Sequence, residues 1–124
     1  MRKKMNFLFG VVITVTLLGF ACTPTLTGPE ATKALEIETQ TPDIGSLQYV
    51  VSIKNKTSNK VQGKIRVICD IYPKTPDATT AVAEVNAVVE DLWAPNSSKS
   101  FTLPIKRNSP IPSNIEMHAH IENP

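Results

Sequence analysis

The chain has 124 residues, of which 41% are hydrophobic and 19% charged, and its formal net charge is +2. The charge is unevenly placed, because Arg2, Lys3 and Lys4 precede every acidic residue of the chain. Residues 22–124 therefore hold 10 basic and 11 acidic residues, and a nearly neutral chain lacks the basic surface that nucleic-acid binding requires. We expect one domain with a single modest core, and no nucleic acid among its partners.

The first 21 residues have the parts of a secretory signal peptide. Residues 1–6 are cationic, and residues 7–20 are apolar apart from two glycines and two threonines. A membrane-spanning helix needs about 20 apolar residues, so this run is too short for one. We therefore expect residues 1–21 to be a signal peptide that is cut between Ala21 and Cys22.

The pair Ala21-Cys22 resembles the lipobox of bacterial lipoproteins, in which a small residue precedes an invariant cysteine. The leucine that this family usually has three residues before the cysteine is replaced here by Gly19, with Leu18 one place earlier. The resemblance implies acyl chains such as palmitate on Cys22, and each buried methylene of such a chain contributes about 0.8 kcal/mol to membrane anchoring. Thr23 is not the aspartate associated with inner-membrane retention in enteric bacteria, so the resemblance points to the outer membrane, facing the periplasm.

A second interpretation uses the same bond. Gly19 and Ala21 also satisfy the small-x-small rule of ordinary signal peptidase, which would release a soluble periplasmic or secreted protein. Cys22 would then be free to form a disulfide with Cys69, the other cysteine. Export is common to both interpretations.

From Cys22 onward, the sequence divides into two segments of different composition. Residues 22–32 are rich in proline and threonine and offer no apolar face, so we expect the anchor cysteine and a flexible tether there. Residues 33–124 alternate between apolar and polar with period two, which is typical of half-buried strands, and turn-forming residues separate six such runs. Residues 79–92 could also be helical, but their β-branched valines favour a strand. The prediction for residues 33–124 is an all-β fold, an antiparallel immunoglobulin-like β-sandwich of six to seven strands.

The order of strands and turns resembles small bacterial immunoglobulin-like domains of the FxLYD type. The likeness covers residues 46–106 and rests on three segments: an Asn-containing turn at 51–57, Asp-Ile-Tyr-Pro at 70–73, and Leu, Pro, small residues and Phe across 92–101. Such domains mostly mediate binding or assembly, so the resemblance implies a fold rather than an activity.

His118 and His120 are the only histidines, and Glu116 and Glu122 flank them at the same spacing. Alternate residues of a strand point to one side, so two imidazoles about 7 Å apart could bind one Zn²⁺ or Cu²⁺. A third ligand is missing from this pattern, and the simpler interpretation is a polar, solvent-facing strand.

Trp93 lies at a predicted strand end, where it is either a core anchor or an exposed interaction residue. Cys69 falls on the apolar side of its strand and fits a buried free thiol. The sequence has no phosphate-binding glycine loop, paired-cysteine metal site or nucleophile motif. We therefore expect no enzyme and no cofactor, but a lipid-anchored envelope component that offers loops and sheet edges to a protein partner. The alternative is a small periplasmic metal-binding protein that uses His118 and His120.

Overall fold

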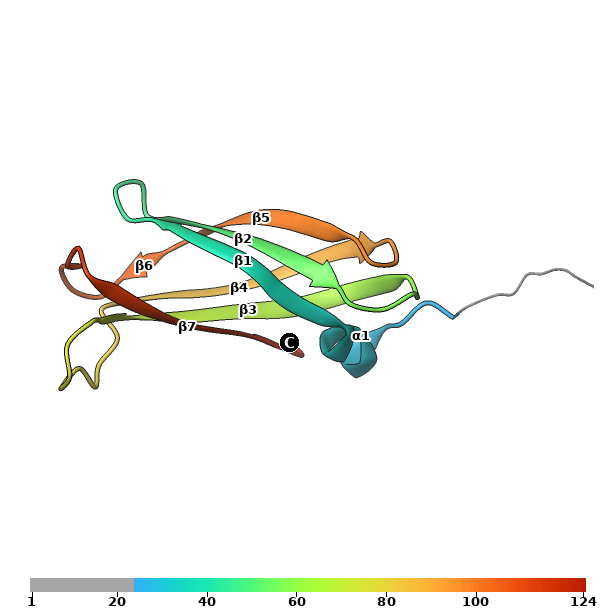
Figure 1. The fold of residues 1–124 in the computed structure, drawn as a ribbon, viewed down its shortest axis with the longest axis horizontal. Helices are drawn as coiled ribbons and strands as arrows, with labels where there is room; N and C mark the ends of the chain where they lie inside the picture. Colours follow the sequence, from blue (N-terminus) through green and yellow to red (C-terminus); the bar gives the residue numbers. More distant parts are fainter. Residues whose placement is uncertain (1–23) are drawn as a thin grey trace, which may run out of the picture.

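The structure, a computed structural model, describes residues 24–124; the predicted signal peptide and Cys22 lie outside the described residues. Two antiparallel sheets pack face to face (Figure 1). The first sheet has the order β1-β2-β5, with β1 at Leu35–Asp43, β2 at Gln48–Asn55 and β5 at Ser98–Pro104. The second has the order β6-β4-β3-β7, with β6 at Lys106–Arg107, β4 at Ala83–Trp93, β3 at Val61–Pro73 and β7 at Ile115–Glu122. The predicted all-β antiparallel sandwich is confirmed, with seven strands.

The longest pairing joins β3 to β4. It runs without a register shift from Val61 opposite Trp93 to Ile71 opposite Ala83. The strand prediction for residues 79–92 is confirmed from Ala83 onward, while residues 79–82 belong to the preceding loop. Valine loses side-chain freedom in a helix and packs well on a pleated surface, which explains why this Ala/Val/Glu-rich segment is extended.

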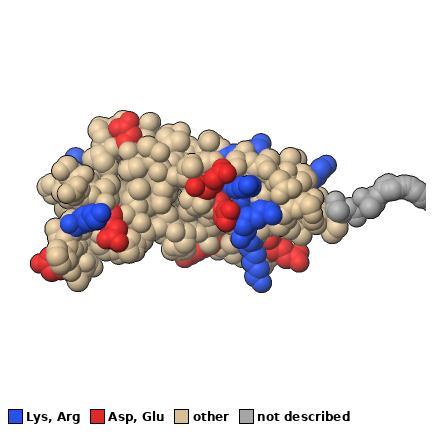
Figure 2. All heavy atoms as spheres, in the orientation of Figure 1, with Lys and Arg blue, Asp and Glu red and all other residues tan. Residues whose placement is uncertain are grey.

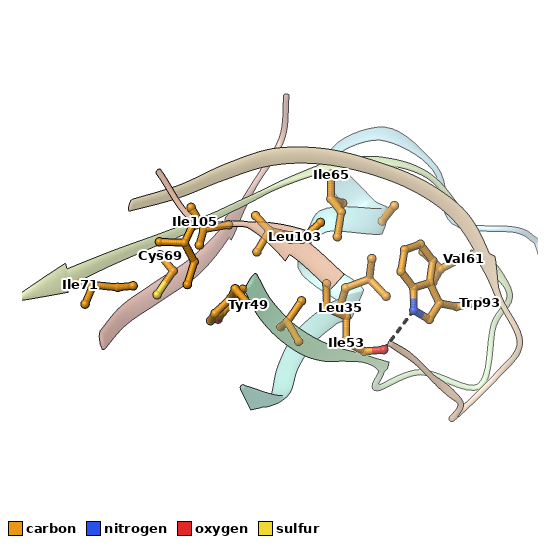
Figure 3. Packing of buried hydrophobic residues seen from close by; sticks show 14 of the residues in the cluster. Leu35, Tyr49, Ile53, Val61, Ile65, Cys69, Ile71, Trp93, Leu103 and Ile105 are labelled. Atoms are coloured by element: carbon orange, nitrogen blue, oxygen red, sulfur yellow. Dashed lines mark hydrogen bonds between the residues drawn. The ribbon is translucent and has the colours of Figure 1, made fainter. Parts of the chain in front are cut away.

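The core lies between the two sheets and is built from alternate residues of each strand. Most of those that face the other sheet on β2 and β3 have no exposed surface: Tyr49, Val51, Ile53, Ile65, Val67, Cys69 and Ile71. Figure 3 shows the labelled members of this set, among them Tyr49, Ile53 and Ile65, between the two sheets together with Leu103 and Ile105. The period-two pattern therefore identifies the buried positions correctly.

The expectation of a flexible tether over residues 22–32 is wrong for its second part. Leu26 makes a parallel bridge with Val61, in which its N–H donates to the carbonyl of Lys60 at 2.8 Å. A short helix follows, α1 at Gly28–Ala34, and its two alanines are almost fully buried, at 1% exposure for Ala31 and 4% for Ala34.

This packing depends on small side chains. Ala31 and Ala34 lie three apart and so share one face of α1, which packs on β3 beside Gly63. Pro29 supplies a backbone angle suited to the first turn of a helix. Two alanines are too weak a signal to be recognised in a proline- and threonine-rich segment. No helix within residues 24–124 is long and apolar enough to cross a bilayer.

Candidate functional site

Trp93 is a core residue, and the alternative of an exposed interaction residue is wrong. Its side chain is 0% exposed, and its indole N–H donates to the carbonyl of Ile53 at 3.1 Å, a bond that ties β4 to β2 (Figure 3). Its ring packs against Phe101 with the ring centres 5.9 Å apart. Trp93 lies an even number of residues from the buried Ala83 and Val85, so its side chain points to the same, inward face of β4.

His118 and His120 lie on the exposed outer face of β7, as their alternation predicts. Each imidazole pairs with a carboxylate of its own strand: His118 with Glu116 at 3.2 Å, and His120 with Glu122 at 2.7 Å. The two rings are therefore held toward opposite ends of the strand. Within residues 24–124 no group of three or more His, Cys, Asp or Glu side chains is placed to hold a metal ion. The arrangement gives no support to a metal site built from one copy of the chain.

The ring of His118 also contacts Tyr72 of β3, with the ring centres 5.2 Å apart. These two residues and Glu116 line an open depression of about 380 Å³, whose other wall is the loop between β3 and β4. It contains one carboxylate–imidazole pair, Glu116 and His118, and no serine, cysteine or threonine within residues 24–124 is hydrogen-bonded to that imidazole. The depression is shallow, and its polar groups do not form the nucleophile and base that acyl transfer needs.

Within residues 24–124 Cys69 is a free cysteine, and it is 0% exposed, as its strand position predicts. Burial raises the pKa of its thiol to about 11; the neighbouring Tyr49 hydroxyl acts in the opposite direction, and the nearby Asp70 charge raises the pKa further. Burial likewise raises the pKa of the Tyr49 phenol. A thiol that stays protonated is a poor nucleophile, so Cys69 has a packing role at neutral pH.

One edge of β7 has no strand partner in the described part of the chain, residues 24–124. Its other edge pairs with β3 without a register shift, from Pro73 opposite Ile115 to Arg66 opposite Glu122. Because β7 is last in the strand order, no strand within residues 24–124 pairs with its outer edge (Figure 1). Alternate backbone N–H and C=O groups of this strand therefore face outward, ready to pair with another chain.

The inward side chains of β7 are apolar but only partly buried: Ile115, Met117, Ala119 and Ile121. Three of their four opposite residues on β3 are fully buried, namely Val67, Cys69 and Ile71. The contrast arises because β3 has a neighbour on each side and β7 has only one. The core of the sandwich is thus left partly uncovered along the edge of β7.

A seam between β7 and β1 continues this opening. It forms a depression of about 290 Å³ lined by Leu35, Ile37, Ala119 and Ile121, among others. Thr32 of α1 also lines it, and the Thr32 hydroxyl is the one buried side-chain polar atom within residues 24–124 that lacks a hydrogen-bond partner. The half-buried row and the depression show that the two sheets are incompletely closed on this side.

Both edges of the first sheet carry features that discourage pairing. β1 has a register shift between Ile37 and Thr39 and contains Pro42, and β5 ends at Pro104. In the second sheet, β6 covers the edge of β4 at Ala83 and Glu84, whereas no strand within residues 24–124 pairs with that edge from Val85 to Trp93. Bulges, prolines and covering segments are the usual means by which proteins protect sheet edges, and β7 has none of them. The inward residues of β7 are also half-buried along its whole length, whereas β4 buries Ala83, Val85 and Trp93 fully, so we take the edge of β7 as the candidate functional site.

Charge does not mark a different site on the face drawn in Figure 2. Acidic and basic side chains are interspersed there, and wide areas carry neither. A salt bridge of 3.1 Å joins Lys99 to Asp91, both part-exposed, and such pairs contribute little to stability.

Asn55 is the structural residue that the sequence pattern did not single out. It is 0% exposed, and its amide N–H groups donate to the carbonyls of Asn59 at 2.7 Å and Ala94 at 3.1 Å. Its side-chain oxygen accepts from the backbone N–H of Thr57 at 3.0 Å and from the Thr57 hydroxyl at 2.7 Å. One side chain thus joins two turns. The only sign of this role in the sequence is that Asn55, at the end of a strand, continues the row of inward-facing residues.

Comparisons of this chain with protein-family models, with curated proteins and with solved structures find no match.

Proposed function

We propose that the protein is a lipid-anchored component of the cell envelope that binds a protein partner by β-strand addition at the edge of β7. The observation that carries the binding proposal is the unpaired edge itself, beside a row of half-buried apolar side chains. In β-strand addition, main-chain hydrogen bonds supply affinity and alternate side chains supply specificity. An added strand would cover the exposed part of Ile115, Met117 and Ile121.

Anchoring is supported by the sequence of the leader and by Ala21-Cys22. The packed segment that begins at Leu26 refines this part of the proposal, because only residues 23–25 separate it from Cys22. Three extended residues span about 9 Å, so an acylated Cys22 would hold the sandwich close to the bilayer surface. With Thr23 after the cysteine, we place the protein at the outer membrane, facing the periplasm.

The FxLYD-type resemblance agrees with this proposal, since such domains mostly bind or assemble. The Asn-containing turn on which it partly rests is the one that Asn55 stabilises through four hydrogen bonds. In this proposal the sandwich is a rigid frame that presents a strand edge, rather than a scaffold for catalysis.

Photo-cross-linking of the full-length chain in bacterial envelopes tests the binding proposal. A photoreactive amino acid at His118, on the outer face of β7, should form an adduct with a protein. The same group at Thr102, exposed on the outer face of β5, should form little or none. Equal adduct yields at the two positions, or none at His118, would remove the edge of β7 as a binding site.

A further inference from the structure

We propose that the strand added at β7 is β7 of a second copy, paired antiparallel about a two-fold axis that passes beside His118. The inference deepens the proposed function, on which it rests, by naming the partner and the register. An antiparallel pair of identical strands is self-complementary, so it closes into a dimer and leaves no further edge of β7 open. The two four-stranded sheets would form one continuous sheet.

The pleat restricts the possible registers. The apolar residues of β7 have odd numbers and the polar residues have even numbers, and both sets lie on fixed faces of the sheet. Opposite residues in an antiparallel pair point to the same face, so the numbers of each opposite pair must have an even sum. A shift by one residue would place glutamate and histidine against the core.

Charge selects among the remaining registers. The outer face of β7 reads Glu116, His118, His120, Glu122. Pairing centred on Ala119 places Glu116 opposite Glu122 of the partner subunit twice, and like charges directly opposite are destabilising. Pairing centred on His118 instead places Glu116 opposite the partner's His120 twice, so that each carboxylate faces an imidazole that can donate a hydrogen bond.

The inner face favours the same register. Centring on His118 places Ile115 opposite the partner's Ile121. It also places Met117, which has a large side chain, opposite the partner's Ala119, which has a small one. It also uses the strand from Ile115 to Ile121 in full, whereas centring on Met117 would leave His120 and Glu122 opposite the preceding loop. Each copy would then cover the half-buried apolar row of the other.

The pairing also fixes how two anchored copies would lie. The strands run along the long axis of the molecule, and the described chain begins at one end of it (Figure 1). The two-fold axis beside His118 is perpendicular to the continuous sheet, so it places the two N-terminal ends at opposite ends of the dimer. Both lipid anchors reach one bilayer when this axis lies along the membrane normal, with the long axes parallel to the surface.

Cysteine cross-linking of the full-length chain tests the register. His118→Cys should give a disulfide-linked dimer on mild oxidation, because the two copies of residue 118 are directly opposite. The matched control is Glu122→Cys, on the same strand and face, where side-chain exposure is 48% against 61% at His118. Its two copies would lie about 27 Å apart in this register and should give only the background of the wild-type chain. Buried Cys69 is present in every variant and contributes equally.

A charge exchange provides a second measurement that does not depend on a new cysteine. Glu116→Lys and His120→Glu should each weaken dimerisation about fivefold to tenfold, because each spoils two opposite pairs. The double variant restores opposite charges and should return to within about twofold of the wild-type dissociation constant. Sedimentation equilibrium measures the constants, and circular dichroism checks that each variant folds.

The outcomes separate the two proposals. A disulfide at residue 118 and rescue by the double variant support self-pairing. A monomeric chain, a disulfide at residue 122 instead, or no rescue overturns it. If photo-cross-linking at His118 then captures a different protein, the binding proposal stands without self-pairing; if it captures nothing, both fall.

Discussion

Replacement of Trp93 by alanine should destabilise the domain by about 3–5 kcal/mol, which is a large part of the 5–15 kcal/mol typical of a domain of this size. The indole is fully buried, so its removal leaves a cavity between the sheets and takes away contacts with Phe101. The variant also leaves the carbonyl of Ile53 without the indole N–H that now donates to it. Thermal unfolding should show a fall in Tm of about 12 °C or more.

Two further variants separate the causes. Trp93→Phe keeps an aromatic ring but lacks the indole N–H. Its loss of stability should therefore be smaller than that of Trp93→Ala and should include the contribution of the hydrogen bond to Ile53. Leu92→Ala changes the next residue, which is 47% exposed on the outer face of β4, and should shift stability by less than about 0.5 kcal/mol. If Trp93→Ala were as mild as Leu92→Ala, Trp93 would not be a core anchor.

Replacement of Asn55 by alanine should cost about 2–4 kcal/mol, because it removes four hydrogen bonds at a site with no exposed surface. The N–H of Thr57 would lose its partner, while the carbonyls of Asn59 and Ala94 would each lose one donor and keep those of Thr57 and Ser97. Denaturant unfolding measures the loss. The control is Asn86→Ala on the exposed face of β4, where the side chain accepts one bond from Arg66 at 2.8 Å and the cost should stay below about 0.5 kcal/mol.

An aspartate at position 55 should make the loss of stability depend on pH. Asn55→Asp keeps the acceptor for Thr57 but turns a carboxylate oxygen toward two carbonyls, which raises the pKa of the new carboxyl in the folded state. The difference in free energy of unfolding between this variant and wild type should therefore become smaller as the pH falls toward about 4. At that pH the new carboxyl group is protonated in the folded protein and can donate a hydrogen bond. A deficit that does not change with pH would contradict the hydrogen-bonding role assigned to Asn55.

The fold follows largely from period-two alternation. In β2 and β3 the inward positions are apolar almost throughout, and a one-residue slip would expose all of them, so pattern and burial agree. Residues 26–32 do not form the expected tether, and the sequence hides this because Ala31 and Ala34 are small, Leu26 is held by backbone bonds and α1 contacts Gly63. Such contacts join distant segments and leave little trace in local composition.

The candidate site could be predicted only in part. The outward position of His118 and His120 follows from alternation, but their pairing with Glu116 and Glu122 rather than with a third ligand depends on side-chain geometry. That β7 is an edge strand cannot be read from its own residues, since strand order depends on the whole topology. Trp93 shows the same limit, because its exposure depends on which face of β4 meets β2.

Mass spectrometry of the mature N-terminus tests the envelope account most directly. Chain purified from membranes should begin at Cys22 and carry the added mass of a diacylglycerol and an acyl chain. Cys22→Ser should abolish that mass, whereas Cys69→Ala, a change at the buried thiol, should leave it unchanged. An unmodified Cys22 thiol, or a disulfide between Cys22 and Cys69, would contradict lipid anchoring and leave an exported soluble protein.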